Sequence, residues 1–207
     1  ISLFRSAPNL TILAPAGKEE FILMLNSALS GGGEISGPCI IRYPKAACPQ
    51  GDPAFSLPLE KGRGAWVCRP AGQGLKPGVC IAFSGGLYPQ ALNAREILFR
   101  RGIGADLYNL RFLKPVDEDY LAEIMDSYDF VVFAEEGIKA GGFGEYAASL
   151  ALARSCSARV MVLGARENFE AQGSREELMR LNGLDGESLA EAILAFECAA
   201  PREKAIS

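Results

Sequence analysis

Strands and helices alternate regularly from residue 78 onwards, and this alternation constrains the fold more than any other feature of the sequence. Each short apolar run ends in turn residues and is followed by a helical pattern, which predicts βαβ units and a mainly parallel sheet. Because such crossovers are right-handed, helices should cover both faces of the sheet. The predicted strands are 79–86, 103–111, 129–136 and 158–166, and the predicted helices are 89–102, 114–128, 142–154, about 174–181 and 186–197. The sequence therefore predicts a three-layer α/β domain over residues 78–198.

A smaller α/β pattern precedes this domain. Residues 10–15, LTILAP, are typical of a short strand, and residues 17–30 of a helix whose first turn carries Glu19 and Glu20, where the helix dipole favours carboxylates. Residues 38–43, PCIIRY, are predicted to form a second, buried strand. One such unit is too small to be a domain alone, so we expect residues 1–44 to be the tail of another α/β domain.

Residues 45–77 are rich in proline and glycine and have no sustained periodicity, which indicates a linker. A short hairpin is predicted within it at about 59–68, where Trp66 is expected to cover a hydrophobic edge. Residues 199–207 are expected to form a flexible tail.

The chain contains no histidine, so it cannot by itself supply a Ser-His-Asp or Cys-His nucleophile arrangement. Proton transfer would need carboxylates, lysine, a cofactor or residues of another polypeptide. The six cysteines are widely spaced and form no C-x-x-C pair, so no metal site is predicted. Free thiols are typical of a reducing cytoplasm, where we expect this chain to act.

The net charge is −4, which gives no basic surface for nucleic acid, and no apolar run approaches the roughly 20 residues that a membrane span needs. The sequence begins without an initiator methionine and without the features of a signal peptide. We therefore expect the chain to be a fragment of a longer protein.

The stretch FAEEGIKAGGFGEY places Gly141, Gly142 and Gly144 between a strand and a helix. A phosphate cradle and close packing of a helix end are the two interpretations. The spacing matches neither G-x-G-x-x-G nor a P-loop, so we predict that these glycines are structural. Glu135 and Glu136 end the strand; we expect them to cap amides or pair with a lysine, with a functional role at the strand end as the alternative.

Several segments are distinctive when taken together and in order: APNLTILAPAGKEE, GPCIIRYP, LYNLRFLKPVDEDYL, VVFAEEGIKAGGFGEY and EAQGSREELMRLNGLDGESL. They resemble the C-terminal part of the 1-deoxy-D-xylulose-5-phosphate synthases, a thiamine-diphosphate-dependent family of the transketolase group. The resemblance implies that residues 1–44 end a pyrimidine-binding domain and that 78–198 form a transketolase C-terminal-like domain.

The same resemblance implies a parent enzyme that condenses pyruvate with glyceraldehyde 3-phosphate, with loss of CO₂, in isoprenoid and thiamine precursor synthesis. The parent would bind thiamine diphosphate and Mg²⁺ and form a homodimer. Its catalytic residues would lie upstream of residue 1, so this chain would contain none and bind neither cofactor. Its partners would be the N-terminal and pyrimidine-binding portions of the same enzyme.

The family's R-Y-P arginine, which contacts the phosphate of glyceraldehyde 3-phosphate, matches Arg42, with Tyr43 and Lys45 beside it. A guanidinium group at the carboxyl end of a strand suits a phosphate, because it donates as a fork. Pairing of Arg42 with a carboxylate is the alternative. Gly137 stands where the family has asparagine, and the glycine of R-Y-P-R-G is lost, so the substrate preference stays open. Alternatives for the whole chain are transketolase, a 2-oxo acid dehydrogenase beta subunit, or a stand-alone interaction domain.

Overall fold

The structure, a computed structural model, describes residues 1–31, 33–49, 51–69 and 78–198. Its larger sheet has five strands, in the spatial order β3 (Ala65–Cys68), β5 (Ala105–Asn109), β4 (Val79–Phe83), β7 (Phe130–Ile138) and β8 (Arg159–Ala165). All neighbours from β5 to β8 are parallel, and only β3 pairs antiparallel, with β5. The predicted mainly parallel sheet is confirmed.

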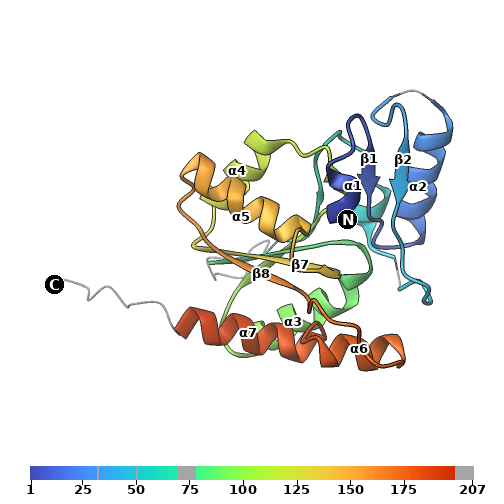
Figure 1. The fold of residues 1–207 in the computed structure, drawn as a ribbon. Coiled ribbons are helices and arrows are strands. Elements are labelled where there is room, and N and C mark those ends of the chain that lie inside the picture. The colour runs from blue at the N-terminus through green and yellow to red at the C-terminus, as the bar shows by residue number, and fades with distance from the viewer. Residues whose placement is uncertain (32, 50, 70–77, 199–207) are drawn as a thin grey trace.

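Helices cover both faces of this sheet (Figure 1). On one side lie α3 (Tyr88–Arg100), α6 (Arg175–Leu181) and α7 (Gly186–Cys198), and on the other lie α4 (Glu118–Asp126) and α5 (Phe143–Arg154). Because successive strand residues point to opposite faces, β4 supplies both layers. Ile81 and Phe83 belong to the core under α3 and α7, whereas Cys80 and Ala82 belong to the core under α4 and α5. The three-layer α/β prediction is confirmed.

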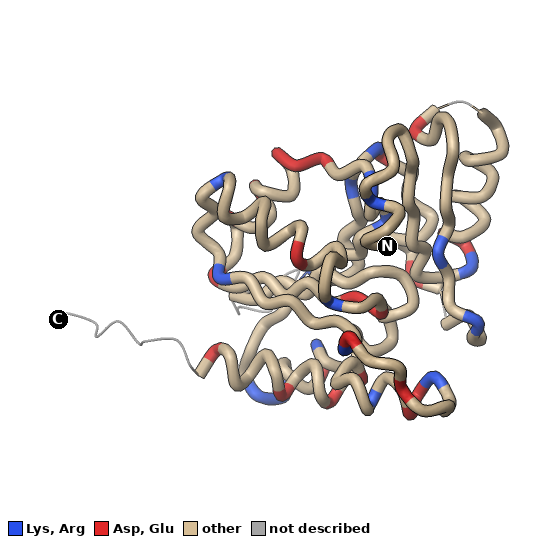
Figure 2. Tube along the Cα trace, in the orientation of Figure 1, with Lys and Arg blue, Asp and Glu red and all other residues tan. Residues whose placement is uncertain are grey.

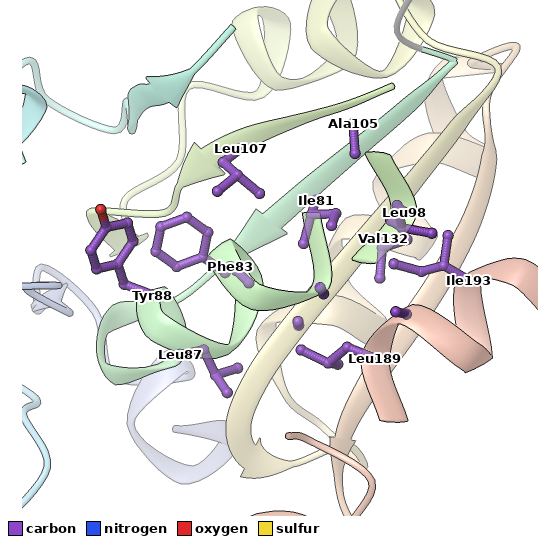
Figure 3. Packing of buried hydrophobic residues seen from close by; sticks show 14 of the residues in the cluster. Ile81, Phe83, Leu87, Tyr88, Leu98, Ala105, Leu107, Val132, Leu189 and Ile193 are labelled. Atoms are coloured by element: carbon purple, nitrogen blue, oxygen red, sulfur yellow. The ribbon is translucent and has the colours of Figure 1, made fainter. Parts of the chain in front are cut away.

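The core under α3 and α7 is the larger apolar cluster. Figure 3 shows Leu98 of α3 and Ile193 of α7 packed near Ile81 and Val132 of the central strands. All four side chains are completely buried. The turn that follows β4 therefore starts from a strand that is buried along its whole length.

A smaller sheet is formed by segments that are distant in the sequence. Its spatial order is β2 (Cys39–Ile41), β1 (Thr11–Leu13) and β6 (Phe112–Lys114), with β1 parallel to β2 and antiparallel to β6. Two helices accompany it, α1 (Ser2–Arg5) and α2 (Lys18–Leu29). The sequence predicted a buried strand at 38–43, and this is wrong: β2 is half-buried because it is the edge strand of this sheet.

The described part of residues 45–77 packs against the larger domain. The 3₁₀ helix η1 (Pro53–Ser56) places Phe55 completely inside the main core, and β3 extends the five-stranded sheet. The predicted hairpin at about 59–68 is wrong, because the single strand found in the described part of this region pairs with β5 and not with a neighbour in sequence. Residues 70–77 and the predicted tail 199–207 lie outside the described residues. The proposed domain boundaries stay predictions.

Candidate functional site

The glycine-rich turn after β7 surrounds a carboxylate of the chain itself. Glu135 is 2% exposed and accepts hydrogen bonds from the backbone N–H groups of Phe143 (3.1 Å) and Gly144 (2.9 Å) at the start of α5. Burial raises the pKa of Glu135, while these two amides and the charge of Arg42 act in the opposite direction. The amides that a phosphate cradle would offer are therefore occupied by Glu135.

The three glycines lie where side chains would collide or strain the backbone. A Cβ atom at Gly142 would lie 2.2 Å from Glu135 Oε1, and one at Gly144 would lie 2.3 Å from Val162 Cγ1. Gly141 has a φ angle of +68°, which L-residues rarely adopt. This geometry supports a structural role, which stays a prediction until it is tested by substitution.

Gly142→Val is expected to lower the free energy of unfolding by roughly 1–3 kcal/mol. Gly142 has an extended backbone that valine can adopt, so the cost comes from overlap with the Glu135 carboxylate. Chemical denaturation measures it. Gly173→Val is the matched control, because Gly173 is exposed and the nearest atom to a Cβ there would be Glu177 Oε2, 3.4 Å away, which is an ordinary contact distance. A stable Gly142→Val variant that has lost affinity for inorganic phosphate would instead support the phosphate cradle.

Glu136 forms an ion pair, whereas Glu135 accepts hydrogen bonds from backbone amides. It pairs with Arg175 at the start of α6, and the same guanidinium group donates to the carbonyl oxygen of Gly86 (2.8 Å). The expected partner type was lysine, and the partner found is arginine. This contact joins the carboxyl ends of β4 and β7 to the C-terminal helices.

Arg42 directly follows β2, and its backbone N–H donates to Leu13 O at 2.8 Å. Its side chain lines a cavity of about 330 Å³, whose other lining residues are Ile1, Phe4, Ile12, Ile40, Ile41 and Tyr43. Among the residues that the structure describes, no hydrogen bond or ion pair of the Arg42 guanidinium group is found. Its charge acts on Glu135 only through the electrostatic field.

Lys45 does not join Arg42. It lines a second cavity of about 450 Å³, while Tyr43 lines both cavities. The structure therefore separates two of the three residues that the sequence grouped around the phosphate. The cause is the chain direction after β2, which carries Pro44 and Lys45 towards the start of α2.

Arg5 is a cation close enough to act on Glu135, and it was not among the residues predicted from the sequence. Its guanidinium group lies 4.0 Å from the centre of the Tyr146 ring and donates to the carbonyl oxygen of Leu113. Burial lowers its pKa, and the charge of Glu135 acts in the opposite direction. Arg5 and Arg42 thus both act electrostatically on Glu135. The sequence offered one indication that Arg5 could lie near Glu135, namely its position just before the A-P-N motif.

A buried ion pair lies at the start of α2, next to the residues of α2 that line the second cavity. Glu20 and Arg111 are 0% and 1% exposed, and Arg111 Nε donates to Glu20 Oε1 at 2.6 Å. Glu20 also accepts from Asn109 Nδ2 and from the backbone N–H of Ala16. Burial raises the pKa of Glu20, and the Arg111 charge opposes this. The network fixes the start of α2, and the sequence had suggested only a helix-dipole role for Glu20.

No group of three or more histidine, cysteine, aspartate or glutamate side chains that could hold a metal ion occurs in the described part of the chain. None of the helices within the described ranges is long and apolar enough to cross a membrane.

The sequence of this chain matches a known protein family. Residues 75–189 match the family model of the transketolase C-terminal domain, which is more than half of the chain. The chain belongs to the transketolase C-terminal domain family. Proteins named 1-deoxy-D-xylulose-5-phosphate synthase are similar over nearly its whole length. The protein from Treponema pallidum is 37% identical over 190 residues, and that from Thioalkalivibrio sulfidiphilus is 34% identical over 198 residues.

These alignments cover 92% and 94% of this chain but only 29% and 28% of the relatives. The predicted resemblance to the C-terminal part of the synthase family is confirmed. Among solved structures, a split-gene transketolase, described as an inactive beta4 tetramer, matches with a TM-score of 0.81 and 26% identity. That match covers 94% of this chain and 60% of the other. Transketolase from Pichia stipitis, with a TM-score of 0.69 and 20% identity, shares the fold.

Proposed function

We propose that this chain supplies the C-terminal part of a 1-deoxy-D-xylulose-5-phosphate synthase. That enzyme condenses pyruvate with glyceraldehyde 3-phosphate and releases CO₂, and we propose that it acts as a cytoplasmic homodimer. The proposal is supported by relatives of this name that align over 92% of the chain and by the ordered motifs around Arg42 and Glu135. The transketolase and 2-oxo acid dehydrogenase alternatives have weaker support, since the curated relatives named above carry the synthase name.

Thiamine diphosphate and Mg²⁺ do not fit the described residues of this chain. The backbone amides at the start of α5 already donate to Glu135. Among the described residues, no three acidic or thiol side chains lie close enough together to coordinate the metal. Thiamine diphosphate supplies carbanion chemistry in enzymes that use it. We propose that the cofactor is held by the remaining portions of the enzyme.

The isolated chain of 207 residues is expected to bind thiamine diphosphate and Mg²⁺ weakly or not at all, and to turn over no substrate. The reason is that it has no histidine and that its glycine-rich turn is filled by a carboxylate. Isothermal titration calorimetry with both cofactors measures the affinity. Micromolar binding to this chain alone would contradict the proposal that the cofactor site lies elsewhere.

We propose that Arg42 binds the phosphate of the acceptor substrate. The observation that carries this is a guanidinium group that lines a cavity at the end of β2, where the other lining side chains are aliphatic or aromatic, and that has no ion-pair partner in the described parts of the chain. A buried or half-buried arginine without a carboxylate partner is suited to receive an anion. Measuring the two half-reactions of the complete enzyme separately tests the assignment, because only the acceptor half involves a phosphate.

A second candidate is a separately encoded subunit that assembles with an N-terminal chain. It is favoured by the structural likeness to a split-gene transketolase. Under this proposal, the isolated chain would gain activity when mixed with a separately expressed thiamine-diphosphate-binding subunit from the same genome. A neighbouring gene that encodes such a subunit would support it, and one continuous reading frame through this segment would contradict it.

A further inference from the structure

A cavity of about 450 Å³ lies at the carboxyl end of β4, and Tyr43 lines both this cavity and the cavity of Arg42. It is bounded by the start of α2, the loop after β2 and the turn between β4 and α3. In the sheet, β4 lies between β5 and β7. The chain passes from β4 to β5 on one side, and after β5 it crosses back past β4 to reach β7 on the other side, so the direction of the connections reverses at β4. Ligands of open α/β sheets bind at such switch points, outside the carboxyl ends of the strands.

The walls of this cavity are mainly apolar. Phe21 and Tyr43 contact each other edge to face, with ring centres 5.0 Å apart, and Pro44 and Pro89 complete the surface around them. A volume of about 450 Å³ lies within the range of small-molecule sites, roughly 300–1,000 Å³. The cavity is thus large enough for an aromatic or aliphatic group of a small metabolite.

The charged groups at this cavity are basic. Lys18 and Lys45 approach it from two different segments, and neither forms a hydrogen bond or ion pair with any residue that the structure describes. Figure 2 shows basic residues, in blue, in the region of the start of α2 and the loop after β2. Arg175 also lines the cavity, but its charge is paired with Glu136.

Within the described part of the chain, the nearby carboxylates form no ion pair with these lysines. A Cβ atom at Gly51 would be 2.9 Å from Glu19 Oε2, and one at Gly17, which lines the cavity, would be 3.7 Å from the same oxygen. Glu20 is buried in the pair with Arg111. The first turn of α2 carries both Glu19 and Glu20, which already balance the positive end of the helix dipole, so the attraction for an anion comes from the two lysines.

We propose that this cavity binds a small organic phosphate, whose anionic end lies between Lys18 and Lys45 and whose apolar part lies against Phe21, Tyr43 and Pro89. The site shares Tyr43 with the cavity of Arg42 but has its own charged residues, Lys18 and Lys45, so it is an additional ligand site and does not depend on the proposed substrate role. Apolar walls with two unpaired cations are complementary to a ligand that has an apolar body and one strongly charged end.

Phenyl phosphate is a suitable probe; phenol lacks its charge, and inorganic phosphate lacks its apolar body. Calorimetry on the whole chain is expected to show binding of phenyl phosphate at least about tenfold tighter than that of either counterpart. The Lys18→Ala/Lys45→Ala variant should lose about tenfold in affinity or more. The matched control, Lys61→Ala/Lys139→Ala, removes the same charge from exposed positions away from the cavity and should bind as the wild type does.

Thiol reactivity locates the ligand. Cys48 lines the cavity and is exposed, and Cys198 is exposed at the end of α7. At ten times the dissociation constant, phenyl phosphate should slow alkylation of Cys48 by N-ethylmaleimide by about tenfold and leave Cys198 unchanged. The proposal would be overturned if phenyl phosphate did not protect Cys48 from alkylation, or if it still bound after both lysines were replaced. It would also be overturned if binding were lost in the Arg42→Ala variant.

Discussion

Replacing Arg111 by methionine is expected to lower the free energy of unfolding by about 3–5 kcal/mol, because it leaves the Glu20 carboxylate charged and unpaired inside the protein. The guanidinium group also donates to three backbone oxygens, those of Ala54, Leu57 and Pro58. These acceptors would lose their partners as well. Urea denaturation followed by circular dichroism measures the change.

The matched control is Arg63→Met, which removes an ion pair between partly exposed side chains, Arg63 and Asp117, and should change stability far less. A double variant, Glu20→Met with Arg111→Met, should cost less than the sum of the two single variants, because neither charge is then left alone. Additive losses, or an Arg111 variant as stable as the Arg63 variant, would show that the buried pair does not hold the fold.

This ion pair explains why the segments before residue 70 pack as they do. Glu20 belongs to α2, the three acceptor oxygens lie in and after η1, and Arg111 precedes β6. One guanidinium group therefore joins three parts of the chain that are distant in sequence. The start of α2 borders the 450 Å³ cavity, so the ion pair also holds one wall of that cavity in place.

The elements that the sequence predicted well are those that local patterns determine. The helix predicted at 142–154 is α5, Phe143–Arg154, and Asp117 caps α4 by accepting from the N–H of Tyr120, as its position before two acidic residues indicated. Strands β4 and β7 are apolar over most of their length, which is typical of strands covered on both faces.

The features that the sequence did not reveal depend on contacts between distant segments. Glu20 and Arg111 are 91 positions apart, and nothing near either residue indicates the other. The strand β6 has only three residues, too few to show an alternation of apolar and polar side chains. The sequence around β3 is typical of one strand of a hairpin, but β3 pairs with the distant strand β5. At the site, the position of Arg42 after a strand followed from the sequence, but its separation from Lys45 required the path of the loop after Tyr43.

Arg42→Ala in the complete enzyme is expected to lower kcat/KM for glyceraldehyde 3-phosphate by roughly 2–4 kcal/mol of transition-state stabilisation, or about 30- to 1,000-fold. The phosphate would lose a charge-assisted contact and would face a cavity whose other lining side chains are aliphatic or aromatic. Arg42→Lys should recover only part of the loss, because a point charge does not replace the planar fork. Arg100→Ala, at the exposed end of α3, is the control and should leave kcat/KM nearly unchanged.

Our central proposal is that this chain contributes the acceptor's phosphate site and not the chemistry of the first step. The most direct measurement follows the two half-reactions of the Arg42→Ala enzyme separately: formation of the first adduct from pyruvate, and its consumption by glyceraldehyde 3-phosphate. The account predicts nearly normal adduct formation with pyruvate and a loss confined to the acceptor step. Equal damage to both half-reactions would contradict it, because Arg42 would then support the structure of the enzyme as a whole and not the binding of one substrate.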